Sequence, residues 1–189
     1  MKKRCAWAKH PLEIEYHDNE WGIPVHDDTK LFEFLLLDAF QAGLSWLTIL
    51  KKRNNFRESF DHFDYKKIAQ YSDKKVNELM NNKGIIRNKL KIEAGIKNAQ
   101  NFIRLQEKYG SFDQYIWQFT KGQTLVNYWE KPGDIPTETT ESQAMSKALK
   151  KEGFNFTGPT ICYAFMQAAG MINDHEISCF RHKEVLAKS

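Results

Sequence analysis

The chain has 189 residues, of which 41% are hydrophobic and 13% aromatic, and its formal net charge is +4. This composition excludes a disordered chain and predicts one globular domain over residues 1–189. No apolar run reaches the roughly 20 residues that span a bilayer, so we expect no membrane association. The simplest expectation is a cytoplasmic monomer.

Cysteine and histidine pairs stand near both ends of the chain: Cys5 with His17, and His175 with Cys179. Two thiolates and two imidazoles are the ligand set of a closed tetrahedral zinc site. The spacing is not that of a zinc finger, so such a metal would clasp together the termini of a fold formed by other means. The alternative is four ordinary buried residues, because Cys and His also occur in protein cores.

The first strong helical signal begins at Asp28 and Thr29 and carries apolar residues at helical spacing. Gly43 is expected to end this helix as a left-handed C-terminal cap. Ser45 is then expected to cap a second helix that carries Trp46.

Asp38 is the residue of the first helix that most strongly indicates a functional site. It follows three leucines and precedes an alanine and a phenylalanine, so its neighbours on a helix are largely apolar. A buried carboxyl without a partner is costly and marks a functional site more often than a core. Gln41 lies about one turn further on and is a candidate for a second polar contact.

The charge is concentrated in the middle of the chain. Residues 45–110 contain fifteen Lys or Arg against seven Asp or Glu, a balance of +8, so the other 123 residues together carry −4. The segment is a candidate surface for a polyanion and a candidate second lobe beside the termini. The alternative is a set of solvated, lysine-rich helix faces.

A helix, a short glycine-containing hairpin and a longer helix are predicted inside this segment. Ser72 opens the first helix, which breaks near Gly84, and the second carries an apolar stripe from Ile92 to Ile103. A tight turn that leads into a helix presents free backbone N–H groups to which a phosphate binds. Such a helix-hairpin-helix element could bind DNA through the turn at Gly84, with Lys83, Arg87, Lys89 and Lys91 holding adjacent phosphates. The alternative, which this segment alone favours, is an ordinary corner between two helices.

The sequence after residue 110 also predicts helices, with one long connection between them. Ser111 is expected to cap a helix that runs to Phe119, and residues 120–139, with two glycines and two prolines, to form a long connection. Two last helices are predicted at about 140–152 and 159–169. No segment shows a sustained period of two, so the predicted fold class is all-α.

Four segments, in order from Cys5 to Cys179, closely resemble the motifs of the bacterial DNA-3-methyladenine glycosylase I family, a branch of the helix-hairpin-helix DNA glycosylases. They are YHDNEWG at 16–22, LLLDAFQAGLSW at 35–46, KGIIRNKLKI at 83–92 and GFNFTGPTICYAFMQAAGMINDH at 153–175. The resemblance implies a compact helical enzyme that excises 3-methyladenine from alkylated double-stranded DNA. It also implies one structural zinc ion held by Cys5, His17, His175 and Cys179.

The matching positions suggest roles for further residues. The resemblance places Tyr16, Trp21 and Trp46 on the walls of the base pocket, where aromatic faces suit a flat cation. Gly43 and Leu44 match the family's loop that fills the vacancy left by a flipped base. On their own they read equally well as a C-cap glycine and a buried leucine.

Two positions depart from the family. Asp38 stands where the family normally has a glutamate that contacts the methylated base, and it is one methylene shorter. Glu13 stands where an aromatic residue is common, and the segment from Cys5 to His17 is one residue shorter than in relatives. The DNA-facing rim, which includes Trp7, is therefore expected to differ.

The chemistry predicted for Asp38 is hydrolysis without a covalent intermediate. No lysine is convincingly placed as a nucleophile, and the superfamily's catalytic aspartate, about twenty residues beyond the hairpin, has no counterpart here. We predict a monofunctional glycosylase that flips the base and leaves an abasic site. The alternatives are a catalytically weakened protein that binds damaged DNA, a glycosylase for another alkylated base, and a zinc hydrolase with an open metal position.

Overall fold

Helices make up most of the computed structural model, which describes residues 2–186. The α-helices within this range are α1 Pro11–Asn19, α2 Asp28–Gln41, α3 Trp46–Ser59, α4 Tyr65–Ile68, α5 Asp73–Asn81, α6 Lys89–Tyr109, α7 Phe112–Trp117, α8 Thr140–Lys151, α9 Pro159–Ala168 and α10 Phe180–Leu186. Two strands of two residues each, β1 Leu125–Val126 and β2 Ile172–Asn173, pair in parallel. The all-α expectation is confirmed, with this one short pairing added.

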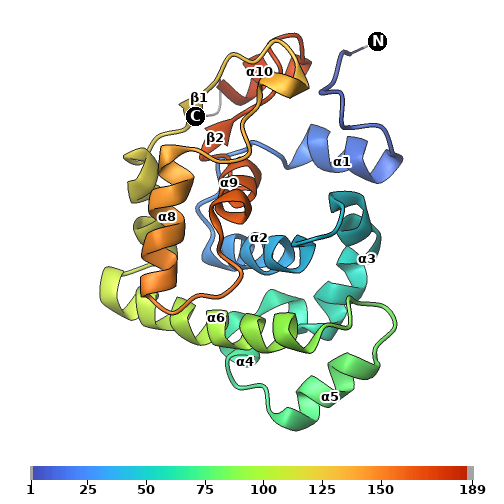
Figure 1. Cartoon of the computed structure of the whole chain (residues 1–189), viewed down its shortest axis with the longest axis vertical. Helices are drawn as coiled ribbons and strands as arrows, with labels where there is room; N and C mark the ends of the chain where they lie inside the picture. Colours follow the sequence, from blue (N-terminus) through green and yellow to red (C-terminus); the bar gives the residue numbers. More distant parts are fainter. Residues whose placement is uncertain (1, 187–189) are drawn as a thin grey trace.

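Helix α2 lies near the centre of the molecule (Figure 1). Every residue from Leu31 to Phe40 is buried, and α3, α6, α7 and α9 pack around the helix. Its start is fixed by Asp27, whose side chain accepts a hydrogen bond from the N–H of Lys30. A polar side chain within this buried stretch, such as that of Asp38, therefore needs a pocket or a partner for its contacts.

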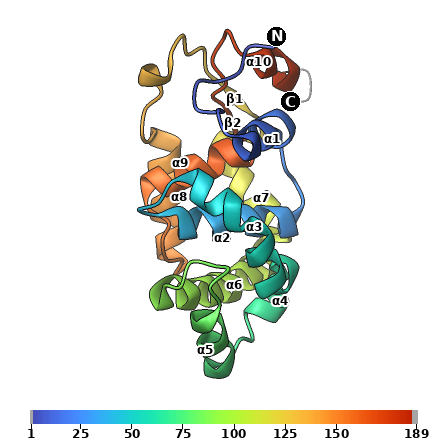
Figure 2. The same cartoon turned by 90° about the vertical axis from the view of Figure 1, so that its right-hand side faces the viewer.

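The two ends of the elongated molecule are built differently (Figures 1 and 2). At one end α5 projects beyond the start of α6, and Asn88 caps α6 by accepting from the N–H of Lys91. At the other end the N-terminal segment meets α10, where the N–H of Phe180 donates to the carbonyl of Lys3 at 2.9 Å. The first and last described segments of the chain are therefore neighbours.

Three helices were not predicted from the sequence: α1, α4 and α10. With four to nine residues each, they have too few turns to display an apolar stripe, and only Tyr16 and His17 of α1 are buried. Helix α7 ends at Trp117 and continues as a 3₁₀ turn to Thr120, near the predicted end at Phe119. Within residues 2–186, none of these helices has the length and apolar character needed to cross a membrane.

Candidate active site and metal-binding cluster

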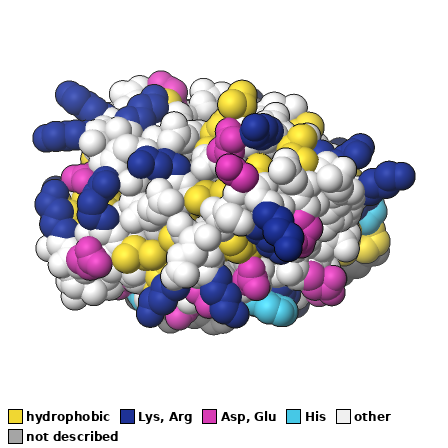
Figure 3. Space-filling view, turned by 90° about the horizontal axis from the view of Figure 1, so that it is seen from below, with side chains coloured by type: hydrophobic (Ala, Val, Ile, Leu, Met, Phe, Trp, Pro, Cys, Tyr) yellow, Lys and Arg dark blue, Asp and Glu magenta, His cyan; other side chains and the backbone are white. Residues whose placement is uncertain are grey.

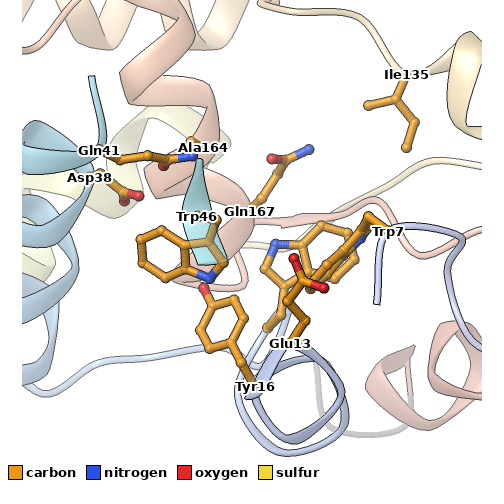
Figure 4. Close-up of a pocket in the computed structure, with 10 residues that line it drawn as sticks. Trp7, Glu13, Tyr16, Asp38, Gln41, Trp46, Ile135, Ala164 and Gln167 are labelled. Carbon is orange, nitrogen blue, oxygen red and sulfur yellow. The ribbon is translucent and has the colours of Figure 1, made fainter. Parts of the chain in front are cut away.

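A pocket of about 280 Å³ opens between α1, α2, α9 and the start of α3 (Figure 4). Five residues predicted to bind the base or act on it line the pocket together, although 30 positions separate the first from the last: Tyr16, Trp21, Asp38, Gln41 and Trp46. The lining residues are Trp7, Glu13, Tyr16, Trp21, Asp38, Gln41, Trp46, Ile135, Ala164 and Gln167. The set combines aromatic rings with a few polar groups, which is the usual make-up of a small-molecule site.

Aromatic rings form the walls of this pocket. The rings of Tyr16 and Trp46 lie 5.1 Å apart between centroids, and those of Trp7 and Trp21 also 5.1 Å. Tyr16 and Trp21 are buried, and Trp46 packs partly buried against the core. Trp46 follows Ser45, whose hydroxyl accepts from the N–H of Thr48 and so fixes the start of α3 beside the pocket.

Asp38 places a carboxyl at the inner end of the pocket. Asp38 is only 2% exposed, and within residues 2–186 no group forms a hydrogen bond with its Oδ2 atom. Burial raises the pKa of Asp38 well above its ordinary value of 3.8 and so favours the protonated carboxyl. Gln41, one turn along α2, lines the same pocket. Burial, and then the nearby Asp38, also raise the pKa of Tyr16.

Gln167 is a pocket residue to which the sequence analysis assigned no role. It sits in α9, and its Nε2 donates to Oδ2 of Asp174 at 2.8 Å. Asp174 is buried and accepts three more hydrogen bonds, from Tyr163, Asn127 and Trp129. One signal in the sequence pointed to Gln167: like Asp38, it is a polar residue in an otherwise apolar helix.

Arg53 holds the helices behind the pocket together. Its guanidinium contacts Glu20, just after α1, at 2.7 Å and Glu33 of α2 at 2.8 Å, and Lys30 adds a contact of 2.9 Å to Glu20. Burial opposes ionisation, but hydrogen bonds from Arg53 and Lys30 outweigh it and lower the pKa of Glu20 to about 2. The arrangement fixes α1, which carries Tyr16, against α2 and α3.

The four cysteine and histidine residues from the two ends of the chain converge in one buried cluster. The ligand atoms of Cys5, His17, His175 and Cys179 all lie within 4.8 Å of one another. The Sγ of Cys5 is 3.5 Å from Nδ1 of His175, and the Sγ of Cys179 is 3.4 Å from Nε2 of His17. This group could hold a metal ion, as the sequence predicted.

The outer nitrogen of each histidine has its own partner. Nδ1 of His17 donates to Asp18 at 2.8 Å, and Nε2 of His175 donates to the carbonyl of Trp21 at 3.1 Å. Each ring therefore turns its other nitrogen, as an acceptor, toward the two thiols. Such partners are characteristic of metal-binding histidines, because they fix both tautomer and orientation.

The cluster and the pocket share a wall. The ring of Trp21 lies 4.6 Å from that of His175, and the ring of Trp7 lies 5.4 Å from that of His17. Both tryptophans line the pocket. A displacement of the cluster would therefore displace the pocket's aromatic rim.

The loop between α2 and α3 carries Gly43 and Leu44. Gly43 has φ +78°, a left-handed conformation that favours glycine, and it ends α2 as predicted. Leu44 is 41% exposed, which is unusual for a leucine beside a large core and contradicts the alternative of a buried leucine. The loop thus presents a small residue and an apolar side chain to solvent.

The α5–α6 loop presents the predicted glycine and cations. A Cβ on Gly84 would lie 3.0 Å from side-chain atoms of Asn55 and Asn82, so a larger residue would require these side chains to shift by a few tenths of an ångström. Arg87 and Lys89 are exposed. Figure 3 shows this end of the molecule from below, with Lys and Arg side chains around its rim and acidic ones between them.

Lys91 differs from the surface cation that the sequence analysis expected. The residue is only 6% exposed, and its Nζ donates to the carbonyls of Phe40 at 2.7 Å and Ala42 at 2.6 Å. Its charge is used inside the protein, where it satisfies carbonyls at the end of α2. Lys91 therefore lies apart from the exposed cations of the hairpin.

Comparisons with known proteins agree with the resemblance seen in the sequence. A family model described as methyladenine glycosylase matches residues 6–182. DNA-3-methyladenine glycosylase 1 of Escherichia coli (strain K12) is 47% identical over 178 residues, which are 94% of this chain and 95% of the relative.

Solved structures give the same result. A crystal structure of 3-methyladenine DNA glycosylase I has a TM-score of 0.92 at 48% identity, over 94% of this chain and 98% of that one. A second, of a variant of 3-methyladenine DNA glycosylase I in complex with 3-methyladenine, has a TM-score of 0.91 at 35% identity, over 94% and 96% of the two chains.

Proposed function

The chain belongs to the methyladenine glycosylase family, and on that premise we propose that the pocket around Asp38 receives a 3-methyladenine flipped out of double-stranded DNA. The enzyme is a DNA-3-methyladenine glycosylase. The observation that carries the proposed site is a buried carboxyl without a hydrogen-bond partner among the described residues, set between aromatic rings at the inner end of a pocket.

The charge of the lesion explains what these groups do. The base of a 3-methyladenine nucleotide is cationic, so it is attracted to the faces of Tyr16, Trp21 and Trp46. A cation beside Asp38 lowers the pKa of its carboxyl relative to the empty pocket, and the proton is released. The resulting carboxylate stabilises the bound cation and, as the bond to the sugar breaks, the positive charge that develops there.

The bond that breaks joins N9 of the base to C1′ of the sugar. Its electron pair goes to the base, which leaves as neutral 3-methyladenine, and a water molecule adds to C1′ and loses a proton. None of the described residues that line the pocket is a lysine, which supports hydrolysis without a Schiff base and an abasic site as product. Asp38 regains its proton when the neutral base departs.

DNA contacts are proposed for the two exposed loops. Leu44, with Gly43 beside it, is suited to enter the space that the flipped base leaves, because apolar side chains insert between base steps in other DNA-binding proteins. The α5–α6 pair is proposed as a helix-hairpin-helix element, in which the close backbone at Gly84 and the cations Arg87 and Lys89 bind phosphates. Lys91 is assigned a supporting role for the α2–α3 loop.

The cluster of Cys5, His17, His175 and Cys179 is proposed as a structural zinc site. A tetrahedron with Zn–S of about 2.3 Å and Zn–N of about 2.0 Å has S–N edges of about 3.5 Å. The S–N distances of 3.4, 3.5 and 3.7 Å in the cluster fit this figure. Four protein ligands leave no position for a reacting water, so the zinc would stabilise the fold and take no part in the reaction.

The test is release of free base from methylated duplex DNA by the wild-type protein and by Asp38→Ala. We expect 3-methyladenine release by the wild type and a loss of at least about 100-fold in the variant, the usual effect of removing a group that stabilises charge. Binding of methylated DNA without release would instead favour a damage-binding protein. Release of a different base alone would reassign the substrate.

A further inference from the structure

The amide of Gln167 has one satisfied orientation. Asp174 accepts hydrogen bonds from four donors, and the only group that Gln167 can offer it is the Nε2 amino group. The reversed amide would press its oxygen against a carboxylate oxygen at 2.8 Å, with no hydrogen between them.

The other half of the amide is therefore turned to the pocket. In Figure 4 the oxygen of Gln167 lies on the side of Asp38 and Gln41, and the nitrogen points away from them. The pocket thus contains a hydrogen-bond acceptor whose direction is fixed by a buried carboxylate outside the pocket.

A fixed acceptor selects for a donor on the base. The base of a 3-methyladenine nucleotide carries N–H hydrogens only on its 6-amino group, whereas guanine has an oxygen at the same ring position. An oxygen that faces an oxygen in the pocket would leave both without a hydrogen bond, and sites that leave polar groups unpaired in this way reject the wrong ligand strongly.

Asp38 supplies less of this selection. As a carboxylate it balances the charge of either cationic lesion, and as the neutral acid it can turn a hydroxyl toward an acceptor or an oxygen toward a donor. The oxygen of Gln167 can only accept.

We propose that Gln167 is a specificity-determining residue that accepts a hydrogen bond from the 6-amino group of the methylated adenine, and that Asp174 is the positioning residue that keeps the Gln167 oxygen turned toward the base. This inference rests on the proposed function, because it takes the pocket to be the site of the flipped base.

The direct test compares two free bases that differ only in the 6-amino group, 3-methyladenine and 3-methylpurine. Their binding to the wild type and to Gln167→Met is measured by quenching of tryptophan fluorescence. We expect the variant to lose about tenfold in affinity for 3-methyladenine, the effect of one hydrogen bond, and to bind 3-methylpurine as the wild type does. Unchanged 3-methylpurine binding also shows that the variant is folded.

Gln106→Met is the matched control. In the wild type, Nε2 of Gln106 likewise donates to an aspartate, Asp28, at 2.6 Å, but Gln106 lies outside the pocket. The affinities for 3-methyladenine and 3-methylpurine should therefore stay at wild-type values. Equal losses for the two bases in Gln167→Met, or no loss for either, would overturn the proposal.

Asp174→Asn should reduce the preference for 3-methyladenine, because an asparagine can donate to the Gln167 oxygen and release the amide from its one orientation. A full preference in that variant would remove the positioning role.

A base-release assay separates this inference from the proposed function. On DNA that carries both 3-methyladenine and 3-methylguanine, Gln167→Met should lower the ratio of released adenine to guanine lesions by about tenfold. If the wild type releases no 3-methyladenine, the proposed function fails. If it does and Gln167→Met leaves the ratio unchanged, only this inference fails.

Discussion

The ammonium group of Lys91 lies 2.7 Å from the carbonyl oxygen of Phe40 and so joins the start of α6 to the end of α2. Its second acceptor, the carbonyl of Ala42, belongs to the loop that carries Leu44. The proposed phosphate-binding hairpin and the proposed wedge are therefore held in a fixed relation by one buried side chain.

The variant Lys91→Met should lower the free energy of unfolding by about 1–3 kcal/mol, because both carbonyls lose a buried donor. Base release should fall as well, since the loop loses its support, while the salt dependence of DNA binding should stay as in the wild type. Thermal unfolding and binding titrations at several salt concentrations measure these effects. Lys97→Met, an exposed position on the same helix, is the control and should change neither. A flatter salt dependence of DNA binding in Lys91→Met would indicate that Lys91 contacts a DNA phosphate after all.

Arg87→Ala and Lys89→Ala should behave in the opposite way. Both side chains are exposed, so the free energy of unfolding should stay within about 0.5 kcal/mol of the wild-type value. Each variant should weaken binding to any duplex, and the slope of log K against log salt should become shallower by about one, because one phosphate contact is lost. Binding to undamaged duplex at several salt concentrations tests this. A wild-type slope in both variants would argue against the hairpin as the DNA contact.

Asp38→Asn should reveal the raised pKa as a dependence of stability on pH. Above the ordinary value of 3.8, the unfolded chain releases the proton of Asp38, whereas the folded protein keeps it because the carboxyl is buried. The wild type therefore loses stability relative to the variant as pH rises toward the folded pKa, at about 1.4 kcal/mol per pH unit. Thermal unfolding of both proteins across this range measures the difference. Parallel curves would mean that Asp38 titrates normally.

Local chemistry allowed much of the helical fold to be read from the sequence. Ser45 and Ser111 each stand where a helix begins, as predicted, and their side chains accept from the backbone N–H three residues on. These are signals within one turn of the chain, and so is the apolar setting of Asp38. The pairing of β1 with β2 has no such signal, because two residues are too few to show a period.

Prediction from the sequence fails where the role of a side chain depends on a partner that is distant along the chain. Lys91 and Lys89 look alike in a count of charges, and only the fold shows that one of them reaches the carbonyl of Phe40. Gln167 likewise acquires an orientation only through Asp174 and the network behind it. The roles given to Tyr16 and the other pocket residues remain predictions, although the structure gathers them around one cavity.

Cys179→Ser provides the last test, because it separates a metal clasp from a buried polar cluster. The hydrogen bond from Cys5, together with the contacts of the sulfur with His17 and His175, lowers the pKa of the Cys179 thiol, and a thiolate is the form that binds zinc. Serine keeps the size but not the thiolate, so zinc measured in the purified variant should fall and stability should drop by about 2–4 kcal/mol. The affinity for free 3-methyladenine should fall too, because Trp21 packs against His175. Cys162→Ser, also buried but outside the cluster, should keep its zinc. A full complement of zinc in Cys179→Ser would contradict the four-ligand site, whereas a loss of stability when the wild type itself carries no zinc would assign the cluster to packing alone.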